Sequence, residues 1–354
     1  MRIAGLVRAI AANRRGEVPR PSYVTWLVSF RCNARCGMCD SWRMKPGREL
    51  TVDEAAIVFG RLGKLDAVRL TGGEPFLRDD LVELALVVTA QSDPLLLHVT
   101  TNGSREERAL ELFERHPRRE RLRFLVSFDG LKAEHDRNRG DEVTFDQALR
   151  TVSELKRRGA QVAANHTVIS PASLAGADEL RKRLGAVGVE VQTVLAYEES
   201  SMYSIKLRGK KAEHAIVPDG YPLHPSLSRA EAAAFVDREL ARLGEHRDLA
   251  ARLAKRYYLR GLRSRLHRDH PPELHPRCVA LRSHLRLLPD GRVPVCQFNT
   301  ETVGSLLEQT LDELYQSAPA TRARAWVDAC PGCWAECEVL PSAIYTGDLL
   351  RALV

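Results

Sequence analysis

Three cysteines lie close together near the start of the chain, in the segment Cys32-Asn33-Ala34-Arg35-Cys36-Gly37-Met38-Cys39. This CxxxCxxC spacing follows an apolar run, residues 23–28, that predicts a strand. Three thiolates can bind three irons of a [4Fe–4S] cube and leave the fourth iron open to a small molecule. Structural zinc takes four ligands, and disulfides need paired thiols. Two alternatives remain open from these residues alone: a chance cluster of cysteines, or one lobe of a zinc site.

The triad resembles the signature of the radical S-adenosylmethionine (SAM) superfamily, CxxxCx(aromatic)C, in the loop after the first barrel strand. Met38 stands in the aromatic position and keeps an apolar, polarizable side chain there. The resemblance implies that Cys32, Cys36 and Cys39 bind a [4Fe–4S] cluster. It also implies that SAM chelates the open iron through its amino and carboxylate groups.

The cysteines and the composition indicate the class of protein. The chain has 354 residues, of which 44% are hydrophobic, enough for one large domain and a smaller one. Its 8 cysteines fall into two groups, at 32–39 and 278–337, as metal ligands often do. No signal peptide is evident, and no run approaches the ~18–20 apolar residues that span a bilayer. We expect a cytoplasmic protein without an integral membrane span, because oxygen-labile clusters need a reducing compartment.

The net charge of +7 raises the question of an acidic partner. The basic residues are scattered and partly balanced by acids, so we expect no nucleic-acid partner. The densest basic run, residues 252–265, predicts an amphipathic helix. Its charge suits either a solvated helix face or a patch for an acidic substrate, a leader peptide or an anionic surface.

Apolar runs that predict strands alternate with helical patterns, which together predict a parallel α/β sheet. The predicted strands are 23–29, 67–71, 95–100, 123–128, 161–168 and 189–195, and the predicted helices are 52–64, 79–91, 105–115, 144–158 and 173–187. Thr51 and Glu54 form a predicted capping box. These patterns suit a doubly wound sheet or a barrel, and the resemblance implies a partial (β/α)6 TIM-like barrel with its chemistry at the carboxyl ends of the strands.

We expect four regions along the chain. They are an N-terminal helix (1–20), the radical SAM partial barrel (21–200), a helical insertion or bridge (201–276), and a small hairpin-containing iron–sulfur domain (277–354). The insertion is rich in Pro, His and charge, with helical patterns near 229–243 and 249–266.

Polar motifs follow several predicted strands. Gly72 and Gly73 allow the backbone to approach a ligand, and the Glu74 carboxylate can bind an ammonium group, although a tight turn also explains this motif. The segment 100–103 likewise suits a turn and a helix N-cap. The resemblance implies that the strand-end residues contact or surround SAM. The candidates are Gly72, Gly73, Glu74, Thr101, Asn102, Ser127, Asp129, Arg139 and Asn165.

For two of these candidates, the surrounding sequence indicates the role less specifically. Arg139 belongs to an expected loop, residues 135–140, where it either pairs with a carboxylate or is solvated. Asn165 lies in an otherwise apolar strand, where its amide is costly unless it is hydrogen-bonded. His166 points to the opposite face by strand alternation, and we expect it to be structural.

The second group of cysteines lies in the C-terminal region. Cys278 and Cys296 flank an alternating run around Pro289-Asp290-Gly291, which predicts a β-hairpin that brings the two thiols together. The layout resembles the SPASM and twitch extensions of radical SAM enzymes. Its spacing is most similar to that of radical SAM aminocyclitol dehydrogenases. The cysteines of this group are Cys278, Cys296, Cys330, Cys333 and Cys337.

Seven cysteines are typical of a full SPASM domain, so five imply one auxiliary [4Fe–4S] cluster. On the twitch pattern the first four thiols bind it and Cys337 is spare, although Cys337 can also replace Cys330. A zinc ribbon with four thiolate ligands is the structural alternative.

The resemblance implies a radical SAM enzyme of the oxidoreductase type. It would cleave SAM to a 5′-deoxyadenosyl radical and oxidise or rearrange a small molecule such as a polyol, sugar or aminocyclitol. A ribosomal peptide is the alternative substrate. We expect the barrel to begin near Tyr23, which leaves no room for an N-terminal leader-binding domain and favours the small molecule. A non-enzymatic iron–sulfur electron carrier is disfavoured, because such carriers use closed four-cysteine clusters. The expected partner is a one-electron donor such as flavodoxin or ferredoxin.

Overall fold

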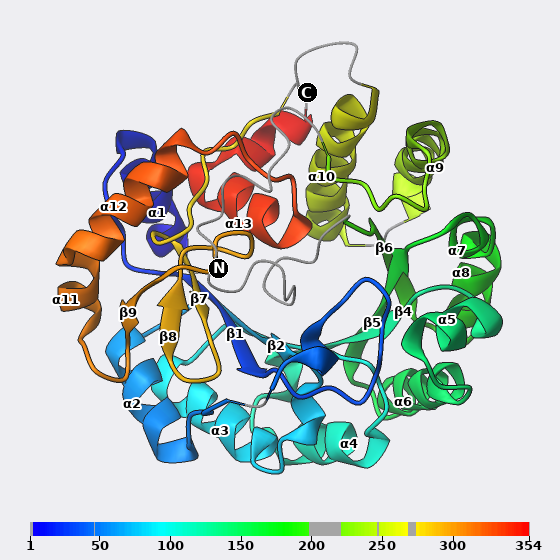
Figure 1. Cartoon of the computed structure of the whole chain (residues 1–354), viewed down its shortest axis with the longest axis horizontal. Coiled ribbons are helices and arrows are strands. Elements are labelled where there is room, and N and C mark those ends of the chain that lie inside the picture. The colour runs from blue at the N-terminus through cyan, green and yellow to red at the C-terminus, as the bar shows by residue number, and fades with distance from the viewer. Residues whose placement is uncertain (1–2, 46, 198–220, 246–247, 268–273, 354) are drawn as a thin grey trace.

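The sheet at the centre of the molecule has seven strands in the order β6-β5-β4-β3-β2-β1-β7 (Figure 1). The computed structural model describes residues 3–45, 47–197, 221–245, 248–267 and 274–353. Each of the strands β1 to β5 pairs in parallel with the strand that follows it in the chain. This order has no reversal, so it confirms the partial barrel and excludes the doubly wound alternative.

The sheet strands are β1 (Tyr23–Ser29), β2 (Ala67–Gly72), β3 (Leu96–Thr101), β4 (Leu122–Phe128), β5 (Gln161–Val168), β6 (Glu190–Leu195) and β7 (His284–Leu287), and a separate two-stranded sheet contains β8 (Arg292–Pro294) and β9 (Thr302–Ser305). The helices are α1 (Ile3–Arg15), α2 (Val52–Leu62), α3 (Leu81–Ser92), α4 (Glu106–Arg115), α5 (Lys132–Arg139), α6 (Thr144–Arg157), α7 (Pro171–Ala175), α8 (Ala177–Ala186), α9 (Arg229–Ala241), α10 (Leu249–His267), α11 (Leu311–Gln316), α12 (Ala318–Ala329) and α13 (Glu336–Thr346).

Helices α2, α3, α4 and α6 lie along the outer face of the sheet (Figure 1). Alternate strand residues such as Val68 and Val99 are fully buried against them. The capping box is confirmed, because Thr51 Oγ1 accepts from the Glu54 backbone N–H and the Glu54 carboxylate accepts from the Thr51 N–H. On the inner face, the remaining strand residues line the lumen of the barrel.

Two helical predictions differ from the structure. The segment expected as a loop at 135–140 belongs to α5, which ends at Gly140 in the left-handed conformation, φ +74°. Its polar sequence lacks an apolar stripe, so helical periodicity could not reveal it. The expected helix 173–187 is two helices, α7 and α8, which meet at Gly176.

The predicted hairpin around Pro289-Asp290-Gly291 is wrong in its strand pairing. The chain does turn there, and the Leu288 N–H donates to the Arg292 carbonyl at 2.9 Å. Strand β7, however, pairs in parallel with β1 from His284 to Leu287, and β8 pairs with β9 in an antiparallel hairpin. Because β1 would otherwise expose an unpaired edge, the C-terminal region completes the barrel sheet across the expected boundary at residue 277.

The two helices predicted in the expected insertion, at 229–243 and 249–266, are confirmed as α9 and α10. Residues 201–220 of this region lie outside the described residues. Helix α10 is not simply a solvated basic helix. It buries Tyr257, Tyr258 and Leu262 in a second core shared with α9 and α13, and its Arg265 guanidinium lies 3.8 Å above the Trp334 ring.

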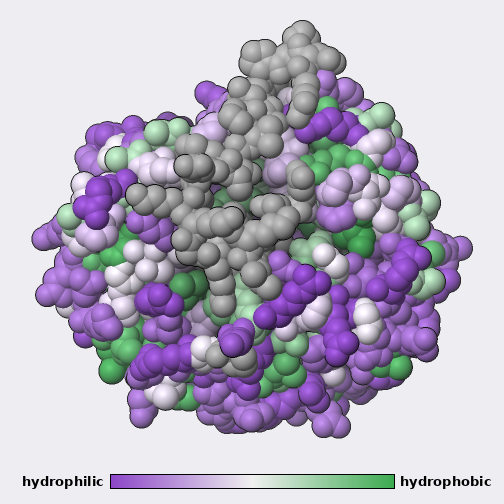
Figure 2. Space-filling model, viewed as in Figure 1, coloured by the Kyte–Doolittle hydropathy of each residue, from purple (hydrophilic) through white to green (hydrophobic). Residues whose placement is uncertain are grey.

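Hydrophilic side chains predominate over the outer helices on the face in Figure 2, and hydrophobic ones form small separate groups. This distribution is typical of helices that bury one face against a sheet. Among the described residues, no helix is both long enough and apolar enough to cross a membrane.

We predict that Gly261→Ala destabilises the protein. A Cβ at this position of α10 would lie 1.7 Å from Trp334 Cζ2, and Trp334 is buried with its Nε1–H donating to the Tyr258 carbonyl at 2.9 Å. Overpacking of this kind costs about 1–3 kcal/mol. The matched control is Gly185→Ala in α8, where a Cβ would meet nothing within 4 Å and should stabilise the helix by about 0.5–1 kcal/mol. Thermal unfolding midpoints compared with wild type check both signs, and an unchanged midpoint for Gly261→Ala would contradict the packing argument.

Candidate functional site

The loop after β1 carries the cysteine triad at the carboxyl end of the sheet. Cys32, Cys36 and Cys39 are free thiols and partly buried. Burial raises the pKa of Cys36 to about 11 and that of Cys39 to about 12. The Ser41 backbone N–H donates to Cys39 Sγ at 3.5 Å. Three thiols on one loop, with a backbone donor directed at sulfur, fit an iron–sulfur cluster.

The loop after β2 packs directly against this cysteine loop. The Gly73 N–H donates to the Ser29 carbonyl and the Glu74 N–H to the Arg31 carbonyl, both at 2.8 Å. A Cβ on Gly73 would lie 2.1 Å from the Arg31 oxygen, and one on Gly72 would lie 2.2 Å from the Ser29 oxygen. The two glycines therefore allow the backbone to approach the cysteine loop closely.

The Glu74 carboxylate lies beneath the surface and joins two strand-end loops. It is fully buried and accepts hydrogen bonds from the Phe76 N–H (3.0 Å), Thr101 Oγ1 (2.8 Å) and the Asn102 N–H (2.6 Å). Burial raises its pKa, opposed by these donors. Asn102 Nδ2 in turn donates to Asn33 Oδ1 at 2.9 Å, so the loop after β3 also supports the cysteine loop.

Asp129, just after β4, forms a buried ion pair with Arg139 of α5. Arg139 Nε lies 2.7 Å from Asp129 Oδ2 and Nη2 lies 2.9 Å from Oδ1. Asp129 has no exposed surface, and although burial opposes ionisation, the Arg139 charge lowers the pKa of this carboxyl. Arg139 is thus paired with a carboxylate, the first of the two predicted alternatives.

Helix α5 also contacts the cysteine loop through its backbone and through Asn138, a residue that sequence reasoning missed. The Arg35 N–H donates to the Arg139 carbonyl at 2.9 Å, and the Gly37 N–H donates to Asn138 Oδ1 at 3.2 Å. Asn138 Nδ2 donates to Asp129 Oδ2 at 2.7 Å and lies 3.3 Å from Met38 Sδ. Only its place beside Arg139 could have indicated this role.

Ser127 and Asn165 lie side by side on adjacent strands, in the same register row as Gln192 of β6. Asn165 and Gln192 line a lumen cavity of about 460 Å³ that extends to Tyr23 at the amino end of β1. His166 faces the other side of the sheet, as predicted, and is buried with Nε2 3.2 Å from Ser173 Oγ.

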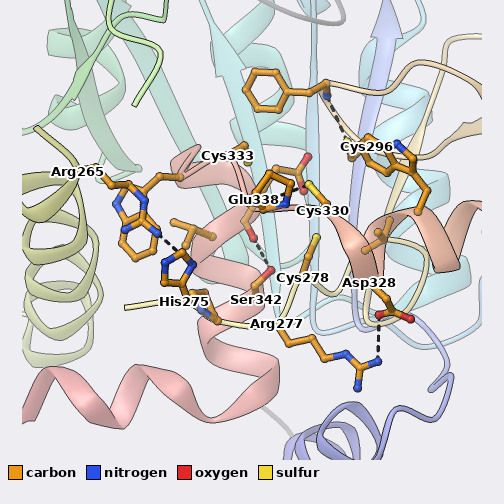
Figure 3. A pocket seen from close by; sticks show the side chains of 18 residues that line it. Arg265, His275, Arg277, Cys278, Cys296, Asp328, Cys330, Cys333, Glu338 and Ser342 are labelled. Carbon is orange, nitrogen blue, oxygen red and sulfur yellow. Dashed lines mark hydrogen bonds and ion pairs between the residues drawn. The ribbon is translucent and has the colours of Figure 1, made fainter. Parts of the chain in front are cut away.

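Four of the five C-terminal cysteines line a second cavity, of about 230 Å³ (Figure 3). They are Cys278, Cys296, Cys330 and Cys333. Burial, followed by the nearby Glu338 charge, raises the pKa of Cys278 to about 12. Backbone N–H groups of Phe298 and Asn299 donate to Cys296 Sγ at 3.3 and 3.2 Å. The thiols and these donors again fit an iron–sulfur cluster.

Cys337 does not line the four-thiol cavity. Residues 338, 339 and 342 of α13 face that cavity, whereas 337, 340, 341 and 344 face the barrel lumen, as helical periodicity dictates. The Cys337 thiol donates to Gln297 Oε1 at 2.7 Å and accepts from Arg286 Nη2 at 3.2 Å.

A buried charge network beneath the second cavity was not predicted. The Glu338 carboxylate accepts from Arg286 Nε at 2.6 Å and lies 3.2 Å from His284 Nδ1. Although burial opposes ionisation, Arg286 and His284 lower the pKa of Glu338 to about 2. The network links β7 to α13. Its acidic and basic members lie far apart in the sequence, so no sequence pattern indicated it.

Family profiles match both cysteine regions. The radical SAM superfamily profile covers residues 26–184, and the SPASM iron–sulfur cluster-binding domain covers residues 278–337. The chain is 33% identical over 207 residues to the pre-heme d1 synthase of Dinoroseobacter shibae (56% of this chain, 48% of that protein). It is 30% identical over 170 residues to the GTP 3′,8-cyclase of Aquifex aeolicus (43% of this chain, 50% of that protein). The chain thus spans about half the length of these curated relatives.

A solved structure shares the fold. It is anSMEcpe with bound AdoMet and the Kp18Cys peptide, which superposes with a TM-score of 0.59 at 18% identity, covering 86% of this chain and 83% of that one. The two family profiles lie on the two groups of cysteines, within the barrel and beside its lumen. The chain is therefore a member of the radical SAM superfamily of enzymes, with a C-terminal SPASM iron–sulfur cluster-binding domain.

Proposed function

We propose that the protein reductively cleaves SAM and abstracts a hydrogen atom from a small molecule bound in the barrel lumen. The observation that carries this proposal is the support of the cysteine triad, at the carboxyl end of the sheet, by the loops after β2 and β3 and by α5. When bound, the cluster and SAM supply an electron and a 5′-deoxyadenosyl radical for hydrogen abstraction. In this proposal Cys32, Cys36 and Cys39 bind the cluster.

The proposed SAM-site residues divide into two kinds. Ser127, Asn165 and the Gly72–Gly73 backbone are partly exposed and are our candidates for direct contact with SAM. Glu74, Asp129 and Arg139 are buried, Glu74 bonds to the loop after β3, and Asp129 pairs with Arg139, so we assign them positioning roles. Thr101 and Asn102 fix the carboxylate of Glu74, and Asn102 also orients Asn33.

The auxiliary site is proposed to be one [4Fe–4S] cluster bound by Cys278, Cys296, Cys330 and Cys333. These four thiols line one cavity, and Cys337 lies on the other side of α13. A cluster there can accept an electron from a substrate radical, which makes a net oxidation of the substrate feasible. An external one-electron donor such as flavodoxin or ferredoxin would reduce the first cluster.

A small molecule of the polyol, sugar or aminocyclitol type is the substrate we favour. The amide groups of Asn165 and Gln192 in the lumen suit hydroxyl groups, and the names of the two curated relatives indicate small-molecule chemistry. A peptide substrate is the second candidate, because the solved structure that shares this fold contains a bound peptide.

The first prediction concerns SAM cleavage. Cys32→Ala, Cys36→Ala and Cys39→Ala should each abolish 5′-deoxyadenosine formation by the reduced protein, because each removes one of the three proposed ligands of the SAM-binding cluster. Cys278→Ala should retain SAM cleavage and lose substrate turnover. Anaerobic reconstitution followed by quantification of 5′-deoxyadenosine checks SAM cleavage in all four variants. Cleavage that survives in the triad variants would refute the proposed function.

The second prediction concerns iron content. Reconstituted wild type should bind about eight iron atoms, and Cys333→Ser about four. Cys337→Ser is the matched control and should keep about eight, since its thiol faces the lumen. Iron analysis with EPR spectra measures both. Loss of the auxiliary signal in Cys337→Ser but not in Cys330→Ser would show that Cys337 is a ligand instead. Stoichiometric zinc would rule out the auxiliary cluster.

The third prediction concerns the buried ion pair. Asp129→Asn leaves the Arg139 guanidinium buried without a counter-charge, which typically costs about 3–5 kcal/mol. Because α5 supports the cysteine loop, iron loading of the triad should fall as well. Glu154→Gln is the control, since it breaks only surface ion pairs with Arg157 and Arg158, and such exposed pairs contribute little to stability. The thermal midpoint and the iron content are measured for both variants. Equal losses in Asp129→Asn and Glu154→Gln would contradict the prediction.

A further inference from the structure

The lumen cavity lies between the proposed cofactor side and α13. It extends from the row of Asn165 and Gln192 down to Arg69 and His98 on β2 and β3, with Cys337 opposite on α13. Arg69, His98 and Arg123 share a register row on adjacent strands. Arg123 precedes Ser127 by four residues, about 13 Å along a strand.

Most charges around this cavity are neutralised within the protein. Arg286 pairs with Glu338 at 2.6 Å, and Lys255 pairs with Glu336 at 3.1 Å. Arg69 differs from them. Its Nε donates to Thr100 Oγ1 at 3.1 Å, and no carboxylate among the described residues lies within ion-pair distance of its guanidinium. The terminal edge of this guanidinium is therefore available to a ligand.

His98, beside Arg69, has an unsatisfied nitrogen. Its Nε2 is buried without a hydrogen-bond partner among the described residues. Burial, followed by the charges of Arg69 and Arg123, lowers the pKa of His98 well below its usual value. A neutral imidazole next to an unpaired guanidinium can donate or accept one hydrogen bond in the cavity. Leaving such groups unpaired in a protein interior costs stability, so a ligand that satisfies them is favoured.

We propose that the substrate carries a carboxylate that binds to Arg69 in this cavity, with His98 as a second contact. The inference rests on the proposed function and names the class of its substrate. The guanidinium edge matches a carboxylate in shape and charge. Arg69 in the lining and Arg123 beside His98 in the same register row bring two positive charges. The lining carboxylates are Asp66, which brings one negative charge, and Glu336, which is neutralised by Lys255. The net excess of one charge matches a monoanion better than a phosphate dianion.

The test compares butyrate with butyramide, its neutral counterpart, on the anaerobically reconstituted protein at constant ionic strength. Butyrate should bind to wild type, seen as a higher thermal midpoint and by calorimetry, and butyramide should not. Arg69→Gln should raise the apparent Kd for butyrate by about tenfold or more, because it removes a charged hydrogen-bond donor. Its thermal midpoint without ligand should equal or exceed that of wild type, since an unpaired charge is removed from the interior.

Arg61→Gln is the matched control. Arg61 donates to the carbonyls of Leu306 and Gln309 outside the cavity, so this variant should lose stability and keep the butyrate response. A butyrate response that persists in Arg69→Gln, or a failure of that variant to fold, would overturn the inference. So would a larger, Arg69-dependent response to inorganic phosphate. SAM cleavage without substrate is measured in parallel: its absence in wild type refutes the proposed function, whereas its presence with no butyrate binding refutes only the inference.

Discussion

The cysteine loop after β1 has no ladder of backbone hydrogen bonds of its own, so its shape depends on neighbours that are far away in the chain. The buried pair of Asp129 and Arg139 is the interaction on which this support depends most. It fixes α5 against the end of β4, and α5 then holds the backbone of Arg35 and Gly37. Because the Arg139 guanidinium is buried and paired with Asp129, α5 cannot move away from β4 without breaking this ion pair. The cysteine loop is therefore held firmly against the barrel.

Buried carboxylates act in the same way at two other places. Glu74 ties the loops after β2 and β3 together, and Glu338 ties β7 to α13 through Arg286 and His284. Each carboxylate is satisfied by several donors, which is the condition under which a buried charge is tolerated. These polar groups therefore specify the relative positions of elements around the cavities, while the apolar faces of the strands supply the bulk of the core.

Helix α13 forms the wall between the two cavities. One of its faces closes the four-thiol cavity, and the other carries Cys337 into the barrel lumen. The 100° turn between successive helical residues separates Cys337 from Glu338, although they are adjacent in sequence. The lumen cavity on the Cys337 side of α13 is also lined by Arg69, whose free guanidinium edge distinguishes this space from an ordinary packed barrel interior.

Local sequence determined the cysteine motifs, the strands β1–β6 and the capping box at Thr51, because spacing, periodicity and capping depend on residues close together in the chain. The family resemblance, and not the local sequence, implied that Glu74, Asp129 and Arg139 belong to one site. Only the tertiary structure decided that these charges support the loop from beneath, that β7 joins β1, and that four of the five C-terminal thiols share a cavity. Such outcomes depend on which distant elements pack together and on which side of a helix a residue lies, and neither is contained in the order of residues along a short segment.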